Sequence, residues 1–194
     1  MFVFGNGESR SRVDIEKIDD IKVGCNAIMR DFRMNHLVCV DRRMVLEAVE
    51  NKVNDHSLIY TRSEWHKHFK DHKRLRVVPD LPYVGNQRWD DPFHWGSGPY
   101  AVLLAAKLCK TRHVKLLGFD LYSKNDKVNN IYKDSANYDS SDKRPVDPRY
   151  WIHQISKTFE IYSNTKFTIF VEDNWQIPKS WKKSNVLVDS ISNI

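Results

Sequence analysis

The sequence has little cysteine and no long apolar run, and these two absences exclude several classes of protein. Its 194 residues contain only Cys25, Cys39 and Cys109. An odd number of cysteines at scattered positions provides neither a disulfide framework nor the paired spacing of a zinc site. We therefore expect free thiols and a reducing, cytoplasmic setting.

The chain also lacks the roughly 18 consecutive apolar residues that a membrane-spanning helix needs. Its apolar start, residues 2–4, ends at Gly5 and is too short for a secretory signal peptide. Charged and aromatic residues are plentiful instead: 31 Lys and Arg against 25 Asp and Glu give a net charge of +6, and aromatics make up 12%. This balance favours anionic partners such as nucleotides, nucleic acid or phosphate-bearing substrates.

Short apolar runs alternate with helical patterns, and this alternation predicts the fold. The runs are rich in Val, Leu and Ile, which is typical of a sheet covered on both faces. We expect a single α/β domain over residues 1–194, Rossmann-like, with a mainly parallel sheet flanked by helices. The expected strands are residues 2–4, 21–25, 37–40, 58–60, 76–78, 114–118 and 167–171. The expected helices are residues 13–18, 43–51, 63–70, 99–109 and 150–162.

Two long stretches lack either pattern. Residues 79–98 carry three prolines and many aromatics, and residues 123–149 are rich in Asn, Asp, Ser and Lys. Loops of this length inside a compact domain are usually functional lids or disordered. We interpret residues 123–149 as a lid-like loop, and we expect the tail after residue 171 to cross the sheet edge or to mediate self-association.

Polar residues follow several of the expected strands, where open α/β sheets bind their ligands. They are Gly5-Asn6-Gly7, Asn26, Asp41 and Asp120. The glycine pair could form a turn at positive φ, an Asn-Gly hairpin, or a bare backbone loop that a phosphate approaches. The gathering of polar residues at strand ends favours the third interpretation.

The segment GSGPYAVLLAAKL predicts a deeply buried helix with an unusual start. Proline is favoured in the first turn of a helix, and the helix start offers unpaired backbone amides to a phosphate or carboxylate. Ser97 and Gly98 could hold such a group, or Ser97 could be a plain N-cap. Beyond the next strand, Asp120 could bind a ribose hydroxyl, hold a metal or cap a loop. Tyr122 could donate to a phosphate or simply pack.

Four segments in order, GNGESR, VGCNAI, SGPYAVLLAAKL and VKLLGFDLYS, resemble the bacterial lipooligosaccharide sialyltransferases of glycosyltransferase family 42. They also resemble the related 6-hydroxymethylpterin diphosphokinase-like domains. The resemblance extends from residue 2 to about 171. It implies a nucleotide-sugar-dependent glycosyltransferase that uses a CMP-sugar as donor and a glycan as acceptor, without a tightly bound cofactor.

The resemblance also implies residue roles. Gly5-Asn6-Gly7 would meet the phosphate and ribose of the donor, Asn26 the nucleotide, and Ser97-Gly98 the sugar carboxylate. Tyr122 and Tyr132 would stabilise the departing phosphate, because donors placed where negative charge develops favour the transition state. Together with the residues at strand ends, the expected binding set is Gly5, Asn6, Gly7, Ser9, Asn26, Asp41, Ser97, Gly98 and Asp120.

The sequence departs from this family at two places. The family has a histidine base late in its lid, and residues 123–149 contain no histidine. His94 and His153 are the candidate bases, since imidazole titrates near neutral pH. Glu8 replaces the proline of the first motif, and its carboxylate would repel a phosphate unless it is turned away.

Two other functions stay open. A pterin-type diphosphokinase would need ATP and Mg²⁺, which Asp90-Asp91 could hold unless these residues cap a loop. A non-catalytic nucleotide or nucleic-acid binder could use basic residues 61–76, in which Trp65 and Phe69 would stack on bases. Alternatively these rings face the core of an amphipathic helix. The histidines of this stretch lack the cysteine or carboxylate partners of a metal shell, so we expect no metal site.

Overall fold

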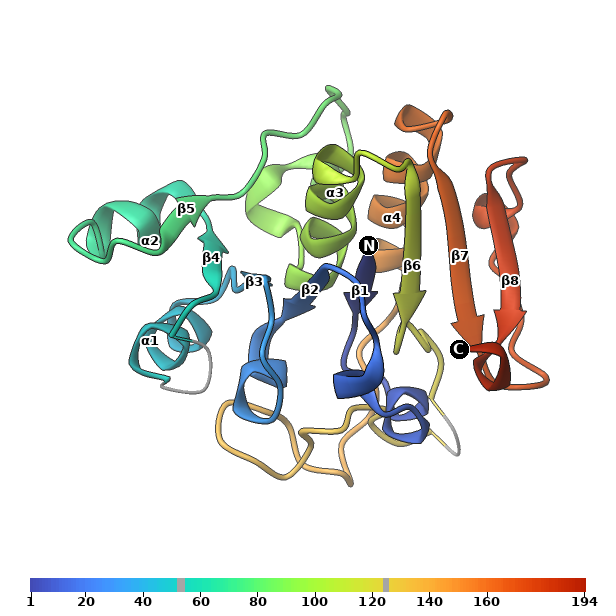
Figure 1. The fold of residues 1–194 in the computed structure, drawn as a ribbon, viewed down its shortest axis with the longest axis horizontal. Helices are drawn as coiled ribbons and strands as arrows, with labels where there is room; N and C mark the ends of the chain where they lie inside the picture. The colour runs from blue at the N-terminus through green and yellow to red at the C-terminus, as the bar shows by residue number, and fades with distance from the viewer. Residues whose placement is uncertain (52–54, 124–125) are drawn as a thin grey trace.

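The computed structural model describes residues 1–51, 55–123 and 126–194 and is built on one sheet of eight parallel strands (Figure 1). The strand order is β5-β4-β3-β2-β1-β6-β7-β8, and every neighbouring pair is parallel. This confirms the expected Rossmann-like α/β fold. The strands are β1 (Phe2–Phe4), β2 (Lys22–Cys25), β3 (His36–Val38), β4 (Leu58–Thr61), β5 (Leu75–Val77), β6 (His113–Leu117), β7 (Lys166–Val171) and β8 (Val186–Ser190).

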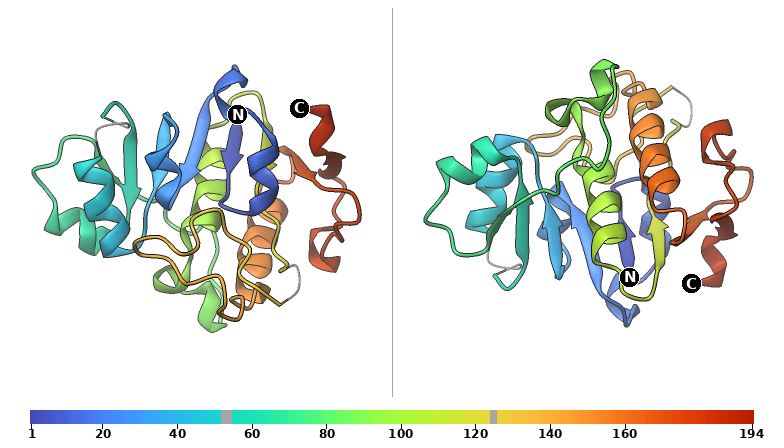
Figure 2. Two further views of the ribbon diagram at one scale, coloured as in Figure 1. Left: turned by 90° about the horizontal axis from the view of Figure 1, so that it is seen from below. Right: turned by 90° about the horizontal axis from the view of Figure 1, so that it is seen from above.

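Helices cover both faces of this sheet, as the apolar strands require. The α-helices are α1 (Arg42–Glu50), α2 (Ser63–His68), α3 (Ser97–Leu108) and α4 (Arg149–Ile161). Helices α3 and α4 lie side by side on one face, and α1 lies on the other (Figures 1 and 2). Successive side chains of β1 point to opposite faces of the sheet. Val3 packs in the apolar cluster that contains α3 and α4, while Phe2 and Phe4 pack in the apolar cluster that contains α1.

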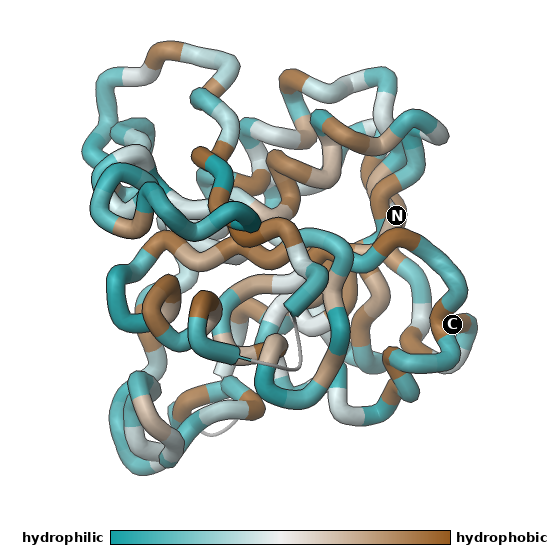
Figure 3. Tube along the Cα trace, turned by 60° about the vertical axis from the view of Figure 1, so that its left-hand side comes forward, coloured by the Kyte–Doolittle hydropathy of each residue, from teal (hydrophilic) through white to brown (hydrophobic). Residues whose placement is uncertain are grey.

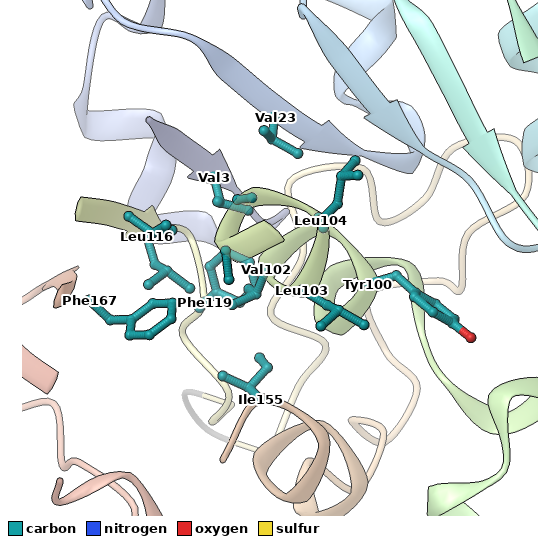
Figure 4. Close-up of a cluster of buried hydrophobic side chains, with 14 of the residues drawn as sticks. Val3, Val23, Tyr100, Val102, Leu103, Leu104, Leu116, Phe119, Ile155 and Phe167 are labelled. Atoms are coloured by element: carbon teal, nitrogen blue, oxygen red, sulfur yellow. The ribbon is translucent and has the colours of Figure 1, made fainter. Parts of the chain in front are cut away.

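Helix α3 forms the centre of the larger apolar cluster. Nine of its 12 residues are buried, because it packs against the sheet on one side and against α4 on another. Figure 4 shows Val102 and Leu104 of α3 close to Val3 and Val23 of the sheet, with Ile155 of α4 beyond. The apolar segments gather in the interior and the hydrophilic ones outside (Figure 3). An amphipathic stripe would be too narrow for this position, which is why the sequence of α3 is apolar on all sides.

The chain departs from the expected elements at two places. Residues 13–18 do not form an α-helix. The Asp14 side chain accepts a hydrogen bond from the Glu16 amide and caps a short 3₁₀ helix. The connection contains η1 (Glu8–Arg12) and η2 (Ile15–Lys17) instead. Strand β8 was not expected from the sequence. It is a half-exposed edge strand, with Val186 buried and Leu187 and Val188 exposed, so its apolar signal is short.

All three cysteines are free thiols and buried. Burial raises the pKa of the Cys25 thiol to about 12, so this side chain stays protonated and behaves as a small apolar group. Among the helices of the described residues, none is long and apolar enough to cross a membrane.

The Gly5-Asn6-Gly7 turn owes its glycines to close packing. Strand β1 pairs in parallel with β2 and β6, so the hairpin interpretation is wrong. Positive φ is not the reason either, because neither glycine adopts it, although Gly118 does at 76°. The Gly5 amide donates to the Leu117 carbonyl and the Gly7 amide to the Gly118 carbonyl, both at 2.9 Å. A Cβ on Gly5 would lie 2.3 Å from the Gly118 oxygen.

We expect Gly5→Ala to lower the free energy of unfolding by about 1–3 kcal/mol, because β1 and β6 would have to separate to admit the methyl group. Gly98→Ala is the matched control, since its Cβ would meet only Phe119 at 3.6 Å, an ordinary contact. Urea unfolding of the two variants measures the difference. Equal stability of both variants would contradict the packing argument.

Candidate functional site

A cavity of about 330 Å³ opens beyond the carboxyl ends of the central strands. It lies where β1 separates β2 from β6, the point at which successive connections run to opposite sides of the sheet. Open α/β sheets bind their ligands at such a point, and the volume suits a small molecule. Of the expected binding residues, the cavity is lined by Gly5, Asn6, Gly7, Asn26, Asp41, Ser97, Gly98 and Asp120.

Ser9, the remaining expected binding residue, lies behind the cavity wall rather than in it. Its hydroxyl and its backbone amide both donate to the Asp120 carboxylate, the amide at 3.0 Å. The Asp120 carbonyl accepts from the Trp175 indole at 2.7 Å. Asp120 is thereby held under the Gly5-Asn6-Gly7 turn, and a Cβ on Gly7 would lie 2.5 Å from its carboxyl carbon.

A buried guanidinium joins this turn to the lid-like loop. The Arg10 side chain is buried and donates to the Gly5 carbonyl at 2.9 Å, to Asn6 Oδ1 at 2.9 Å and to the Tyr132 hydroxyl at 3.0 Å. Tyr132 in turn donates to the Asp31 carboxylate at 2.7 Å. A buried charge is tolerated only with such partners, so Arg10 orients the turn from inside.

The described part of the lid-like loop, residue 123 and residues 126–148, is irregular and contributes residues to the cavity lining. It passes close to the start of α3 (Figure 2). Residues 124–125 lie outside the described residues. The Ile131 amide donates to the Asn6 carbonyl at 2.9 Å. The Tyr138 hydroxyl accepts from Asn6 Nδ2 at 3.2 Å and from the Ala27 amide at 3.3 Å. Both of its lone pairs are then used, and its own hydrogen remains to donate to a ligand.

The start of α3 forms the opposite wall. Its N-cap is Gly96, so the N-cap interpretation of Ser97 is wrong. The Ser97 hydroxyl instead accepts from the Val40 amide at 3.1 Å, which joins α3 to the end of β3. The amides of Ser97 and Gly98 belong to the first turn, whose donors have no partner inside the helix. Both residues line the cavity.

A buried glutamine holds this helix start from behind. Gln154 of α4 is fully buried. Its amide nitrogen donates to the carbonyls of Trp89 at 3.2 Å and His94 at 3.0 Å, and its oxygen accepts from the Gly96 amide at 3.4 Å. The irregular residues that lead into α3 are therefore fixed by side-chain hydrogen bonds.

The four expected catalytic residues lie outside the cavity lining. Tyr132 is buried in the Arg10 network, and Tyr122 is 40% exposed with its ring against Trp175. His153 Nε2 lies 2.6 Å from Asp90 Oδ1, and His94 Nε2 lies 3.4 Å from Arg88 Nε. The cavity is lined instead by Tyr138 and Tyr150. They come from the lid-like loop and the start of α4, and no motif marked them because their approach depends on the tertiary fold.

Three acidic residues near the expected site have structural partners. The Glu8 carboxylate pairs with Lys133 and lies outside the cavity lining. Asp91 accepts from the Phe93 amide at 2.8 Å as an N-cap. Asp90 accepts from the Gln87 amide at 3.0 Å in a capping box. The last two therefore cap loop turns.

The charge of the cavity is acidic. Asp41, Asp120 and Asp139 line it, and its described lining residues include no Lys, Arg or His. Asp41 is the N-cap of α1, but its carboxylate makes no capping hydrogen bond. Within the described parts of the chain, no three acidic, His or Cys side chains come together as a protein-only metal site.

The aromatic rings of residues 61–76 pack against the core, as in an amphipathic helix, and are not free to stack on bases. Trp65 and Phe69 pack against the apolar cluster of α1. The Trp65 indole donates to the Val40 carbonyl at 3.0 Å. Both rings are therefore turned inward, and the charged side chains of this stretch face solvent.

A larger groove, about 540 Å³, lies over the sheet face at β1, β6 and β7. Several of its charged groups have ion-pair partners: Asp20 pairs with the N-terminal amine at 2.8 Å, Lys17 with Asp14 at 3.1 Å and Arg12 with Glu172 at 2.9 Å. Because the groove lies over the face of the sheet and not at the carboxyl ends of the central strands, we place the candidate site in the smaller cavity.

We expect Arg10→Met to lower the free energy of unfolding by about 3–5 kcal/mol, because the Gly5 carbonyl, Asn6 Oδ1 and the Tyr132 hydroxyl lose their donor, two of them in buried hydrogen bonds. Arg33→Met is the matched control, because Arg33 is exposed. Urea unfolding measures both. A loss below about 1 kcal/mol, the size of an ordinary substitution, would show that the network is not required.

Comparison with protein-family models, with curated proteins and with solved structures found no match to this chain. The resemblance to the family 42 sialyltransferases therefore stays a prediction that depends on four short motifs. The function has to be inferred from the chemistry of the cavity.

Proposed function

We propose that this protein is a nucleotide-sugar-dependent glycosyltransferase, similar to the CMP-sialic acid sialyltransferases, and that the cavity at β1 and β6 binds the donor. The observation that supports this most is the composition of the cavity wall. Backbone-rich turns from β1, β2 and β6 meet the start of α3 there. Bare backbone with unpaired amides is the usual environment of a nucleotide phosphate in this class of fold.

The leaving phosphate is assigned to the wall formed by α3 and Tyr138. The Ser97 and Gly98 amides and the positive end of the α3 dipole favour a negative charge. Burial raises the pKa of Tyr138 above its ordinary value, and burial together with Asp41 and Asp147 does the same for Tyr150. Both phenols are therefore neutral at physiological pH and serve as hydrogen-bond donors as charge develops on the phosphate.

Asp41 is our candidate for the general base. In the transfer step the bond between the anomeric carbon and the phosphate oxygen breaks, and an acceptor hydroxyl oxygen bonds to that carbon. The hydroxyl proton needs an acceptor in the cavity. Among the described lining residues, Asp120 is held by Ser9 and Asp139 by Lys143 at 2.6 Å, which leaves Asp41 as the carboxylate without such a partner.

A pterin-type diphosphokinase is the second candidate, and the acidic lining favours it. Three carboxylates would repel a bare polyphosphate, so ATP would have to enter with a divalent cation. Mg²⁺ commonly binds through one or two carboxylates, substrate phosphates and waters. Asp41, Asp120 and Asp139 are the lining carboxylates that would hold it, Asp120 and Asp139 by giving up part of their present hydrogen bonds. The cation would supply charge neutralisation at the transferred diphosphate.

We expect CMP to raise the thermal stability of the protein without Mg²⁺, because a ligand of the folded state adds about 2.7 kcal/mol at a hundred times its dissociation constant. Asn26→Gly should abolish the shift, since it removes a lining side chain while still permitting the φ of 51° at this position. Asn174→Gly is the matched control, because Asn174 has a φ of 73° and is exposed away from the cavity.

The same thermal measurement with ATP separates the two candidates. A shift that requires both ATP and Mg²⁺, with none for CMP, would support the diphosphokinase and contradict the glycosyltransferase. A flat response to CMP, CDP, UDP, GDP and ATP, with and without Mg²⁺, would contradict both and leave the non-catalytic alternative.

We expect Asp41→Asn to lower the rate of CMP release from a CMP-sugar by about 10²–10⁴, the usual contribution of a general base. The amide keeps the shape of the side chain but cannot take the proton, so the thermal shift with CMP should persist. Asp139→Asn is the control. Equal rates in the wild type and Asp41→Asn would exclude Asp41 as the base.

A further inference from the structure

The end of the sheet at α2 and β5 carries most of the net charge of the protein. Residues 61–76 contain six Lys and Arg against Glu64 and Asp71, a net of +4, compared with +6 for the whole chain. Among the described residues, Lys67, Lys70 and Lys73 take part in no ion pair. Figure 1 shows α2 and β5 projecting from one end of the sheet, where β5 is an edge strand.

This charge is not needed to fold the segment. The inner side of α2 is held by Trp65 and Phe69, which pack against the apolar cluster of α1. The lysines are on the solvent side, where charges of one sign repel one another. Surfaces without a charged partner usually intersperse the two signs, so a concentration of one sign favours an anionic partner.

An exposed aromatic ring lies beside the basic segment. Phe93 is 60% exposed, and the Arg62 guanidinium lies over its ring at 4.8 Å from the centroid. Arg62 also donates to the Trp95 carbonyl at 3.3 Å, so the pair is anchored. The nearby Asp91 carboxylate is occupied by the Phe93 amide at 2.8 Å. One face of the Phe93 ring is covered by Arg62, and its exposure leaves ring surface on which a further planar group can stack.

We propose that residues 61–76 and Phe93 form a binding surface for single-stranded nucleic acid, separate from the nucleotide cavity. Lysines along a backbone track together with an aromatic platform are the combination that binds single strands without sequence preference. The lysines contact successive phosphates, and Phe93 stacks on a base. Neither Phe93 nor these lysines line the cavity, so this surface does not depend on the proposed transferase activity.

Fluorescence anisotropy with a labelled oligothymidylate of about twelve nucleotides tests this surface, because a single-strand site covers about 4–16 nucleotides. If three lysines neutralise phosphates, the affinity of the wild type should fall about 20-fold between about 50 and 200 mM salt. The triple variant Lys67→Gln, Lys70→Gln, Lys73→Gln should lose most of this salt dependence. Phe93→Ala should weaken binding about tenfold while leaving the salt dependence in place.

The matched control removes the same charge elsewhere, with Lys107→Gln, Lys110→Gln and Lys179→Gln, all exposed. It should bind the oligonucleotide like the wild type, and all variants should keep the thermal shift with CMP. Equal weakening by the control triple would overturn the proposal, since binding would then follow net charge alone. So would absence of oligonucleotide binding at low salt, including the case in which the protein binds only vesicles of anionic lipid.

Discussion

The buried guanidinium of Arg10 is the interaction on which the site depends. It donates to the Gly5 carbonyl and the Asn6 side-chain oxygen on one side and to the Tyr132 hydroxyl on the other. One side chain therefore connects the end of the first strand with a loop more than a hundred residues later in the sequence. A buried charge is costly unless each of its hydrogens finds an acceptor, so these partners must assemble together. The turn, the lid-like loop and the 3₁₀ segment that carries Arg10 consequently form one structural unit.

Charge is distributed unevenly around this unit. The cavity wall contains carboxylates, backbone amides and phenols, while the excess of positive charge lies at the far end of the sheet on α2 and β5. A ligand in the cavity therefore meets directional hydrogen-bond donors rather than cationic side chains. This difference matters because backbone amides and neutral tyrosines bind an anion at defined positions, whereas surface lysines attract it from many directions and lose strength with salt. The two regions suit different ligands.

Much of the fold follows from local sequence, and much of the site does not. All seven expected strands are present within about two residues, because buried parallel strands carry uninterrupted apolar runs. Eight of the expected binding residues share one cavity, because parallel strands bring their carboxyl ends together. The expected residues that the structure places elsewhere than in the cavity are there for a common reason. Tyr132 and His153 looked available in sequence, but long-range partners at Arg10 and Asp90 occupy them. Tyr138 and Gln154 gained their positions from contacts with distant segments, which no local pattern encodes. Strand β8 was missed because its apolar signal is short. It is an edge strand, and Val186 is the one apolar residue in it that is buried.

The strand order has a consequence for synthesis on the ribosome. Strands β1 through β5 are synthesised in this order, and each pairs with the strand synthesised just before it, so this half of the sheet extends in one direction from β1. The other edge of β1 stays open until β6, residues 113–117, has emerged. During that interval the nascent chain displays an unpaired and strongly apolar edge, Phe2-Val3-Phe4, of the kind that pairs readily with other chains. Closing it requires a contact across more than a hundred residues, which is slow compared with local pairing. The same central position of β1 that creates the cavity thus makes the middle of translation the period when this protein is most exposed to aggregation.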